Sequence, residues 1–178
     1  MSIRKEIYFA GGCFWGMEKL FQQLPGVLET TCGYANGDES IHPDYPRVCQ
    51  GDTGYKETVH VIYDDAQITL DQLLTAYFYV VDPTVENRQG NDIGTQYQTG
   101  IYYVDDEDEN KITSYIQNIK DNFSAFCVEV LPLSSFVAAE EYHQDYLIKN
   151  PTGYCHIPNI KYQQVVEVIN NKHKNIEK

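Results

Sequence analysis

Hydrophobic and polar positions alternate along this chain with the periods of strands and helices. Residues 5–10 combine apolar and aromatic side chains in a short run that predicts a first strand. Five apolar side chains then recur at steps of three and four residues: Cys13, Met17, Leu20, Phe21 and Leu24. This spacing places them on one face of a helix, which the breaker Pro25-Gly26 ends.

The same patterns predict the remaining elements. We expect further strands over 27–34, 57–63, 97–104 and 127–131, and further helices over 69–80, 106–123 and 138–149. Thr69 and Gln72 have the capping-box spacing that opens the first of these helices. Residues 35–53 are polar and contain several Pro and Gly, and a connection of this length indicates a functional loop.

The first six elements follow the order β-α-β-β-α-β. This is the order of the split βαβ, or ferredoxin-like, arrangement, in which helices pack on one face of a sheet. We therefore predict an α+β fold, a two-layer sandwich with a mixed sheet. A long irregular C-terminal segment is expected from about residue 150, before a polar helical end. No repeat or linker divides the chain, so residues 1–178 are expected to form a single domain.

Composition and charge argue against several classes of function. The chain has 178 residues, of which 42% are hydrophobic, and it contains no apolar run near the ~20 residues of a membrane span. Its formal net charge of −13 argues against nucleic acid as a partner. The acidic run at 104–110 is expected to start a helix, where carboxylates are favoured. The N-terminus lacks the apolar core of a signal peptide, so we expect a cytoplasmic protein.

The five cysteines are odd in number, widely spaced and without a CxxC pair: Cys13, Cys32, Cys49, Cys127 and Cys155. This pattern argues against a secreted disulfide framework and a zinc ribbon, and indicates reduced thiols. Cys13 stands between a Gly-Gly pair and the only tryptophan, at the opening of a predicted helix. Unpaired backbone N–H groups there favour a thiolate, so Cys13 is a candidate nucleophile. A small buried residue closing a strand-to-helix turn is the alternative.

Several motifs occur in the order found in one enzyme family. They are GCFWG at 12–16, GYANG at 33–37, YPRVCQGDTGYKE at 45–57, DPT at 82–84, NRQGNDIGTQY at 87–97 and AEEYHQDYLIKNPTGYC at 139–155. With these motifs the chain resembles the A family of peptide methionine sulfoxide reductases, which reverse methionine oxidation. The resemblance implies a catalytic domain that reduces methionine S-sulfoxide in oxidised proteins and as the free amino acid.

The resemblance also implies roles for individual residues. Cys13 would attack the sulfoxide sulfur as a thiolate and remain as a sulfenic acid once methionine is released. Phe14 and Trp15 resemble aromatic walls that hold the methyl group, although ordinary core packing at a helix start is the alternative. Glu57 matches the acid that protonates the sulfoxide oxygen, which requires that burial raise its pKa from ~4.3. A surface glutamate at a strand end is the alternative there.

Three further positions match substrate contacts of the family. Tyr45 and Tyr97 match two phenols that hydrogen-bond the sulfoxide oxygen. Asp92 matches a position tied to substrate binding, although Asn-Asp is also common in turns. The chain departs from the family at Val81, where relatives often have His, and at Lys56, in a run that often reads Gly-His-Ala-Glu. Lys56 stands beside the acid and could alter its environment.

Cys155 matches the first recycling cysteine of the family. It lies in NPTGYCHIPN, a segment with Pro and Gly that we expect to be mobile, and its thiol would attack the sulfenic acid to form a disulfide. No cysteine follows it, which implies a one-step relay from Cys13 to Cys155 and then to an external dithiol such as thioredoxin. No bound cofactor or metal is expected, and Cys32, Cys49 and Cys127 are interpreted as packing residues.

Other classes of function remain open at this point. A cysteine hydrolase or acyl transferase would need a histidine base, and four histidines are candidates: His42, His60, His143 and His156. A non-enzymatic module would bind methionine-containing peptides in an aromatic pocket without consuming dithiol. A metal site has less support, because only Cys155 and His156 lie close together and two further ligands are missing.

Overall fold

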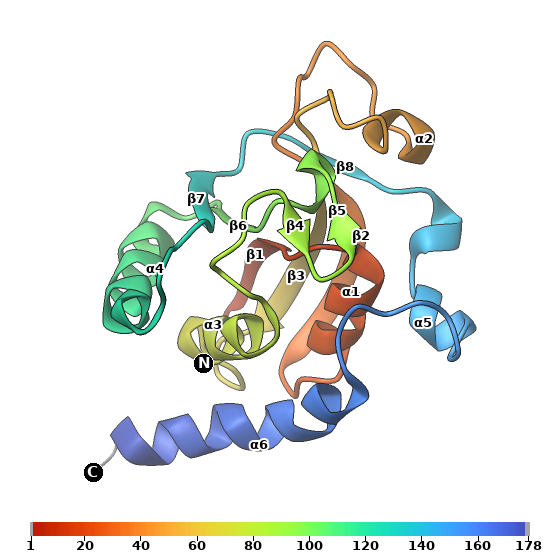
Figure 1. Cartoon of the computed structure of the whole chain (residues 1–178). Helices are drawn as coiled ribbons and strands as arrows, with labels where there is room; N and C mark the ends of the chain where they lie inside the picture. The colour runs from red at the N-terminus through yellow and green to blue at the C-terminus, as the bar shows by residue number, and fades with distance from the viewer. Residues whose placement is uncertain (1, 177–178) are drawn as a thin grey trace.

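A six-stranded mixed sheet forms the centre of the molecule, and the longer helices pack on one of its faces (Figure 1). The computed structural model describes residues 2–176, and the side chains of residues 2–171. The strands lie across the sheet in the order β7 (Glu129–Pro132), β6 (Gly100–Tyr103), β1 (Arg4–Ala10), β3 (Lys56–Asp64), β2 (Val27–Ala35) and β8 (Phe136–Ala138). β6 and β7 are parallel, and every other neighbouring pair is antiparallel.

Helices and a small hairpin make up the rest of the regular structure. The helices are α1 (Phe14–Gln22), α2 (Tyr45–Val48), α3 (Leu70–Val80), α4 (Asp106–Ile119), α5 (Tyr146–Lys149) and α6 (Asn159–Ile176). The hairpin pairs β4 (Arg88–Gln89) with β5 (Asp92–Ile93), and the 3₁₀ turn η1 (Thr95–Tyr97) follows it. Within residues 2–176, no helix has both the length and the apolar composition needed to cross a bilayer.

The central strands show how the order of elements becomes a sheet. β3 lies between β1 and β2 and runs antiparallel to both, so the unit β1-α1-β2 is split by a third strand. The predicted α+β fold with a mixed sheet is confirmed. β7 and β8 form the two edges of the sheet.

The register of the strands fixes what lies at the end of β1. Phe9 pairs with Val59 on β3, so the register continued by two residues brings Gly11 level with Glu57. Glu57 is itself paired with Tyr34 on β2. The turn from β1 to α1 therefore opens beside a carboxyl group in the centre of the sheet.

Side chains of β1 alternate between the two faces of the sheet. Ile7 and Phe9 are fully buried in the main core, which also contains apolar residues of α1, α3, α4 and α6. Tyr8 and Ala10 lie on the opposite face, in a smaller cluster against which Phe136 packs. The end of β1 is therefore buried on both faces of the sheet, which fixes the start of the turn that follows.

The helix predicted over 138–149 is wrong. This segment contains only the end of β8, the 3₁₀ turn η3 (Glu141–His143) and the short helix α5. The Gln144 side chain accepts a hydrogen bond from the Cys32 N–H and donates one to the Cys32 carbonyl, both at 2.8 Å. Asp145 has a φ of 54°, in the left-handed region, which ends helical geometry. Hydrogen bonds to β2 thus replace those of a helix.

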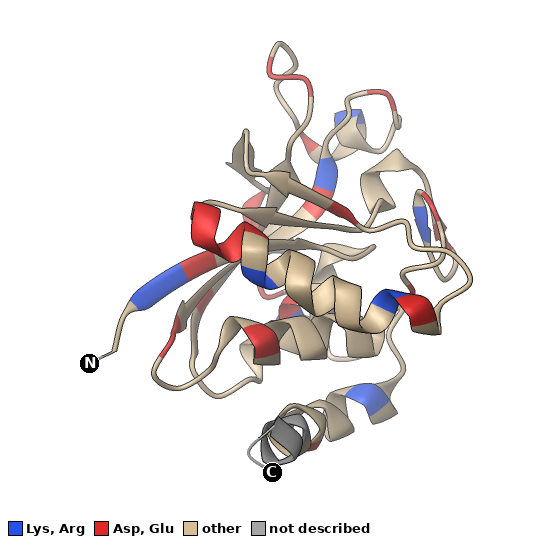
Figure 2. Cartoon of the chain, turned by 90° about the vertical axis from the view of Figure 1, so that its left-hand side faces the viewer, with Lys and Arg blue, Asp and Glu red and all other residues tan. Residues whose placement is uncertain are grey.

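Other boundaries differ by a few residues. The strand predicted from 97 begins at Gly100, because residues 95–97 form η1, and the helix predicted over 106–123 ends at Ile119. Residues 150–158 are irregular as predicted, and α6 forms the helical end. The acidic residues 105–109 occupy the N-cap and first turn of α4, as predicted for this run (Figure 2).

Candidate active site

Cys13 occupies the N-cap position of α1, directly after the turn that leaves β1. Gly12 permits this turn, because its φ of +85° suits glycine and a Cβ there would lie 2.7 Å from Cβ of Gln89. The Cys13 side chain is 7% exposed and makes no capping hydrogen bond. The thiol is therefore held in a nearly enclosed position at the start of a helix.

Glu57 presents a buried carboxyl group to the same turn. Its side chain is 2% exposed, and Oε1 accepts a hydrogen bond from the Phe14 N–H at 3.1 Å. Burial raises the pKa of Glu57 to about 8, an effect that the Phe14 N–H opposes and the charge of Asp92 reinforces. The predicted rise in pKa is confirmed, and the carboxyl group is protonated at neutral pH.

Lys56 and Val81, the two departures from the family pattern, leave this arrangement intact. Lys56 and Glu57 are consecutive on β3 and therefore point to opposite faces of the sheet. Lys56 Nζ donates to the Asn36 carbonyl at 3.2 Å and lies 3.7 Å from a carboxylate oxygen of Glu129. Val81 is buried beside Gly11. Lys56 is thus directed away from the acid.

Two opposing effects act on the protonation of Cys13. Burial raises the pKa of the thiol above its usual value, and the Glu57 carboxyl adds to this effect. The Trp15 N–H at the helix N-terminus lowers the pKa, as predicted, but by less than burial raises it. The predicted effect of the helix terminus is therefore present, and desolvation outweighs it. Thiol and carboxyl group both hold a proton in this site.

Phe14 and Trp15 contribute differently to the first turn of α1. Phe14 is 1% exposed, and its ring centroid lies 5.1 Å from that of His143 and 5.8 Å from that of Tyr34. Trp15 is partly exposed, stacks on Tyr146 with 3.7 Å between ring centroids, and donates from Nε1 to His143 Nδ1 at 2.9 Å. The indole ring is therefore fixed in position while part of its surface remains accessible.

Two phenols share the electrostatic environment of the thiol and the acid. Tyr45 opens α2 and Tyr97 ends η1, and both side chains are partly buried. Burial is the largest cause that raises the pKa of each phenol above its usual value, and Glu57 and Cys13 contribute at both. The structure thus brings both predicted phenols to one site, where they are hydroxyl donors at neutral pH.

The segment that contains Cys155 packs against the same turn. Asp92 Oδ1 accepts a hydrogen bond from the Tyr154 hydroxyl at 3.1 Å, and Oδ2 lies 3.9 Å from His156 Nδ1. A hydrogen bond of 3.1 Å joins His156 Nε2 to the Gly11 carbonyl. The neighbours of Cys155 are therefore bound to β5 and to the turn, where the sequence predicted a mobile segment.

Glu140 was missed by the sequence analysis, and His143 was named there only as a candidate base. Glu140 accepts hydrogen bonds from the Tyr34 hydroxyl at 2.9 Å and from the Tyr45 N–H at 3.1 Å, which fixes the start of α2. His143 is fully buried, and burial lowers its pKa, so its neutral ring accepts the Trp15 hydrogen bond. Both residues lie in AEEYHQDY at 139–146. The helix predicted for this segment gave no indication of these contacts.

The histidines do not provide a base for the thiol. His143 is bonded to Trp15 and His156 to Gly11, and among the described side chains no hydrogen bond joins a histidine to Cys13. The geometry therefore gives no support to a cysteine hydrolase. In the part of the chain that the structure describes, no group of three or more His, Cys, Asp or Glu is placed to hold a metal ion.

The remaining cysteines differ in their exposure. Cys32 is fully buried in β2 and Cys127 is partly buried, in agreement with a packing role. Cys49 is exposed at the C-cap of α2, so its interpretation as a packing residue is wrong. The reason is that α2 lies in the polar loop and not in the sheet.

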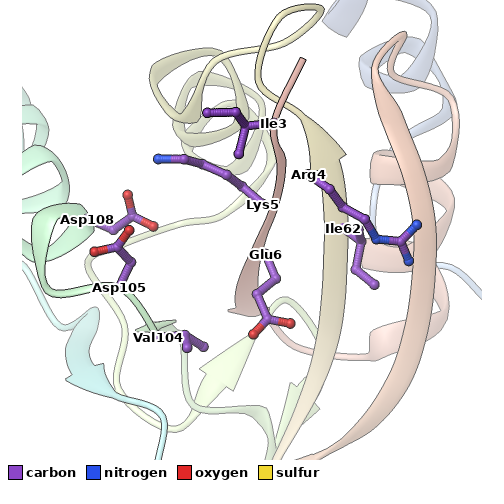
Figure 3. A pocket seen from close by; sticks show the side chains of 8 residues that line it. All are labelled: Ile3, Arg4, Lys5, Glu6, Ile62, Val104, Asp105 and Asp108. Carbon is purple, nitrogen blue, oxygen red and sulfur yellow. The ribbon is translucent and has the colours of Figure 1, made fainter. Parts of the chain in front are cut away.

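A separate pocket lies at the other end of β1. Its volume is about 430 Å³, and it is lined by Ile3, Arg4, Lys5, Glu6, Ile62, Val104, Asp105 and Asp108 (Figure 3). The pocket adjoins the first residues of β1, whereas Cys13 follows the last residue of that strand by three positions. None of its lining residues belongs to the site around Cys13.

Comparisons with known proteins concern the chain as a whole. The family model of peptide methionine sulfoxide reductase matches residues 5–175. The chain is 54% identical to the peptide methionine sulfoxide reductase MsrA of Clostridium acetobutylicum, over 86% of this chain and 95% of that protein. It resembles the reduced form of Mxr1 from Saccharomyces cerevisiae with a TM-score of 0.82 and 38% identity, covering 85% of this chain and 88% of that one. Mxr1 in complex with Trx2 shares the fold, with a TM-score of 0.57, 21% identity and coverage of 80% and 84%.

Proposed function

The chain belongs to the peptide methionine sulfoxide reductase family, and from this membership we propose that Cys13 is the nucleophile and Glu57 the acid of the reaction. The protein is an oxidoreductase that reduces methionine S-sulfoxide to methionine. The observation that best supports the two roles is the protonated carboxyl group of Glu57, buried and bonded to the Phe14 N–H beside the thiol. Nucleophile and proton donor thus stand at one turn.

The proposed reaction moves one oxygen atom from the substrate to Cys13. The Cys13 sulfur attacks the sulfoxide sulfur while the sulfoxide oxygen takes a proton from Glu57. The bond between the two sulfurs then breaks as the hydroxyl group moves from the substrate sulfur to Cys13. The methionine sulfur thereby gains the two electrons that Cys13 loses, and Cys13 is left as a sulfenic acid. The thiol proton of Cys13 replaces the proton that Glu57 donated, so the site returns to its initial charge.

Side chains around the thiol are proposed to bind the substrate. Tyr45 and Tyr97 would donate hydrogen bonds to the sulfoxide oxygen, which is consistent with their shared environment with the acid. Trp15, whose ring is fixed and partly accessible, would contact the methyl group, with the buried Phe14 behind it. Asp92 would bind a polar group of the substrate after exchanging its hydrogen bond with the C-terminal segment.

Cys155 is proposed to resolve the sulfenic acid and to pass the electrons to an external dithiol. The bound position of its neighbours beside the turn supports this role. Mxr1 of Saccharomyces cerevisiae has been solved in complex with Trx2, and thioredoxin is the reductant we propose for this chain. The scheme requires no bound cofactor, because thiols supply both electrons.

We also propose that the substrates are oxidised proteins and free methionine sulfoxide, and that the chain acts as a single catalytic domain in the cytoplasm. The main core includes residues from Ile7 to Ile169, which supports a single unit. Five free cysteines suit a reducing compartment.

A racemic substrate tests the assignment. The enzyme is incubated with methionine (R,S)-sulfoxide and dithiothreitol, and methionine is measured by amino-acid analysis. We expect the reaction to stop near half conversion with the R epimer left, and Cys13→Ser to form no methionine. Complete conversion, or binding without any methionine, would contradict the proposed function.

A further inference from the structure

Gly16, the third residue of α1, is the point where three groups of the C-terminal segment meet that helix. A Cβ at this position would lie 3.1 Å from Tyr162 Oη, 3.2 Å from Cys155 Sγ and 3.3 Å from His156 Cε1. These distances are shorter than ordinary contacts, so the close approach depends on glycine. Glycine destabilises a helix relative to alanine. Gly16 therefore lowers the stability of α1, but it leaves room for Cys155 to approach the helix.

Tyr162 fixes the Cys155 thiol from the other side. The Tyr162 hydroxyl donates to the Gly16 carbonyl at 2.9 Å, which uses its only hydrogen. Cys155 Sγ lies 3.0 Å from the same hydroxyl oxygen, and the thiol donates to the Ile157 carbonyl at 3.4 Å. The Ile157 N–H donates to Sγ at 3.4 Å. The sulfur thus has defined neighbours on α1, on α6 and in its own segment.

Tyr162 is itself firmly held. It is 6% exposed, and the ammonium group of Lys19 on α1 lies 4.4 Å from the centre of its ring. Burial, followed by the hydrogen bond with Cys155, raises the pKa of the phenol above its usual value, so the hydroxyl keeps its proton. α6 has a separate attachment to α3, where the Tyr79 hydroxyl donates to Gln164 Oε1 at 2.7 Å.

This contact point lies close to the nucleophile. Cys13 is the N-cap of α1 and Gly16 follows three residues later, and, besides burial, the charge of Cys155 is among the causes that raise the pKa of Cys13. Cys155 is therefore held one turn from Cys13 before any sulfenic acid has formed.

We propose that Gly16 and Tyr162 form a seat that positions the Cys155 thiol for disulfide formation with Cys13. The inference rests on the proposed role of Cys155 as the resolving thiol. The Cys155 sulfur attacks the sulfenic sulfur of Cys13, the S–S bond forms as the S–O bond breaks, and the hydroxyl group leaves as water with the thiol proton. As that proton departs, the Tyr162 hydroxyl turns from Gly16 to donate to the forming thiolate. Both residues act through Cys155 and are positioning residues.

Tyr162→Phe separates the seat from the first chemical step. With one equivalent of methionine sulfoxide and no dithiol, methionine should form at the unmodified rate. The Cys13–Cys155 disulfide should form about tenfold more slowly, the loss expected of one hydrogen bond to a developing charge. Quenching with dimedone followed by mass spectrometry measures the accumulated sulfenic acid. The pH profile of disulfide formation should move to higher pH, because the thiolate loses a donor, while the profile of methionine formation should stay unchanged.

Two further variants make the test specific. Tyr79→Phe removes a hydroxyl that holds α6 elsewhere, and it should leave the rate of disulfide formation unchanged. Gly16→Ala should slow disulfide formation with the phenol intact, because the added Cβ displaces the thiol by a few tenths of an ångström. If Tyr162→Phe formed the disulfide at the unmodified rate, or if Tyr79→Phe slowed it equally, the proposed seat would be refuted and the role of Cys155 would stand. A failure of the unmodified protein to form the Cys13–Cys155 disulfide would instead refute the role of Cys155.

Discussion

At the scale of single residues, catalysis depends on how Cys13 and Glu57 share protons. Both side chains are nearly inaccessible, and burial raises the pKa of both. A charged thiolate beside a charged carboxylate would be costly in this environment. Cys13 and Glu57 therefore both keep their protons until a sulfoxide oxygen binds that can accept the proton of Glu57. Negative charge on the Cys13 sulfur then develops only during the attack on the substrate.

Glu57→Gln tests the acid. The amide keeps the shape of the side chain and can still accept the Phe14 hydrogen bond, but it cannot donate a proton as a carboxylic acid does. We expect the first-turnover rate to fall by ~10² to 10⁴, with little change in substrate binding. In the unmodified enzyme this rate should also fall as pH rises through about 8, because Glu57 loses its proton there. Rapid-quench measurement of methionine across the neutral and alkaline range checks both results.

The alkaline loss of rate should be absent from Glu57→Gln, since the titrating group is gone. Glu57→Asp serves as the control, because it keeps a carboxyl group and should retain an alkaline loss at a reduced rate. A Glu57→Gln rate within a few-fold of the unmodified enzyme would transfer the acid role to Tyr45 or Tyr97.

The sequence predicted part of this chemistry for a physical reason. The effect of the Trp15 N–H on Cys13 is local, and it was predicted from the position of the cysteine at a helix start. The burial that outweighs it comes from segments distant in the chain, which local pattern does not report. The contact of Glu140 with Tyr34 and that of His143 with Phe14 were missed for the same reason, because they depend on tertiary structure.

At the scale of elements, α3 shows a helix start decided by its own sequence. Thr69 Oγ1 accepts a hydrogen bond from the Gln72 N–H at 3.1 Å, and the Gln72 side chain accepts one from the Thr69 N–H at 2.9 Å. This is the capping box predicted from the spacing of the two residues. α3 packs against α4 and α6 and carries none of the site residues, so its cap acts on stability.

Thr69→Ala should lower the free energy of unfolding by about 1 kcal/mol, because it leaves the Gln72 N–H without its side-chain acceptor. Urea unfolding followed by circular dichroism measures the change. Thr69→Ser keeps the hydroxyl and should recover most of the loss, and both variants should reduce sulfoxide at the unmodified rate. Equal stability of Thr69→Ala and the unmodified protein would show that the cap contributes nothing in this context.

The prediction of a helix over 138–149 was wrong, whereas the prediction of α3 was confirmed. The capping box lies within four consecutive residues, whereas Gln144 bonds to Cys32, which is 112 positions away in the chain. Periodicity cannot distinguish a helix from a segment whose polar side chains bond to a distant strand. The short helix α5 is what remains of the predicted one.

At the scale of the whole molecule, the site is assembled from widely separated parts of the chain. Cys13 follows β1, Glu57 lies on β3, Asp92 lies on β5, and Cys155 precedes α6. The quoted motifs predicted these participants by resemblance, but their contacts follow from the strand register and from the packing of the C-terminal segment. Tyr162 lies outside every quoted motif and bonds to a residue 146 positions away, so no sequence pattern indicated it.

The central claim is that Cys13 receives the oxygen and Cys155 resolves it. The most direct measurement is a single turnover without dithiol, followed by dimedone labelling and mass spectrometry of Cys155→Ser. Cys49→Ser is the matched control, because Cys49 is also a free thiol and is exposed. We predict one methionine per molecule and a dimedone adduct on Cys13 in Cys155→Ser, with a Cys13–Cys155 disulfide in the unmodified protein and in Cys49→Ser. Methionine formed by Cys13→Ser, or an adduct on another cysteine, would contradict the account.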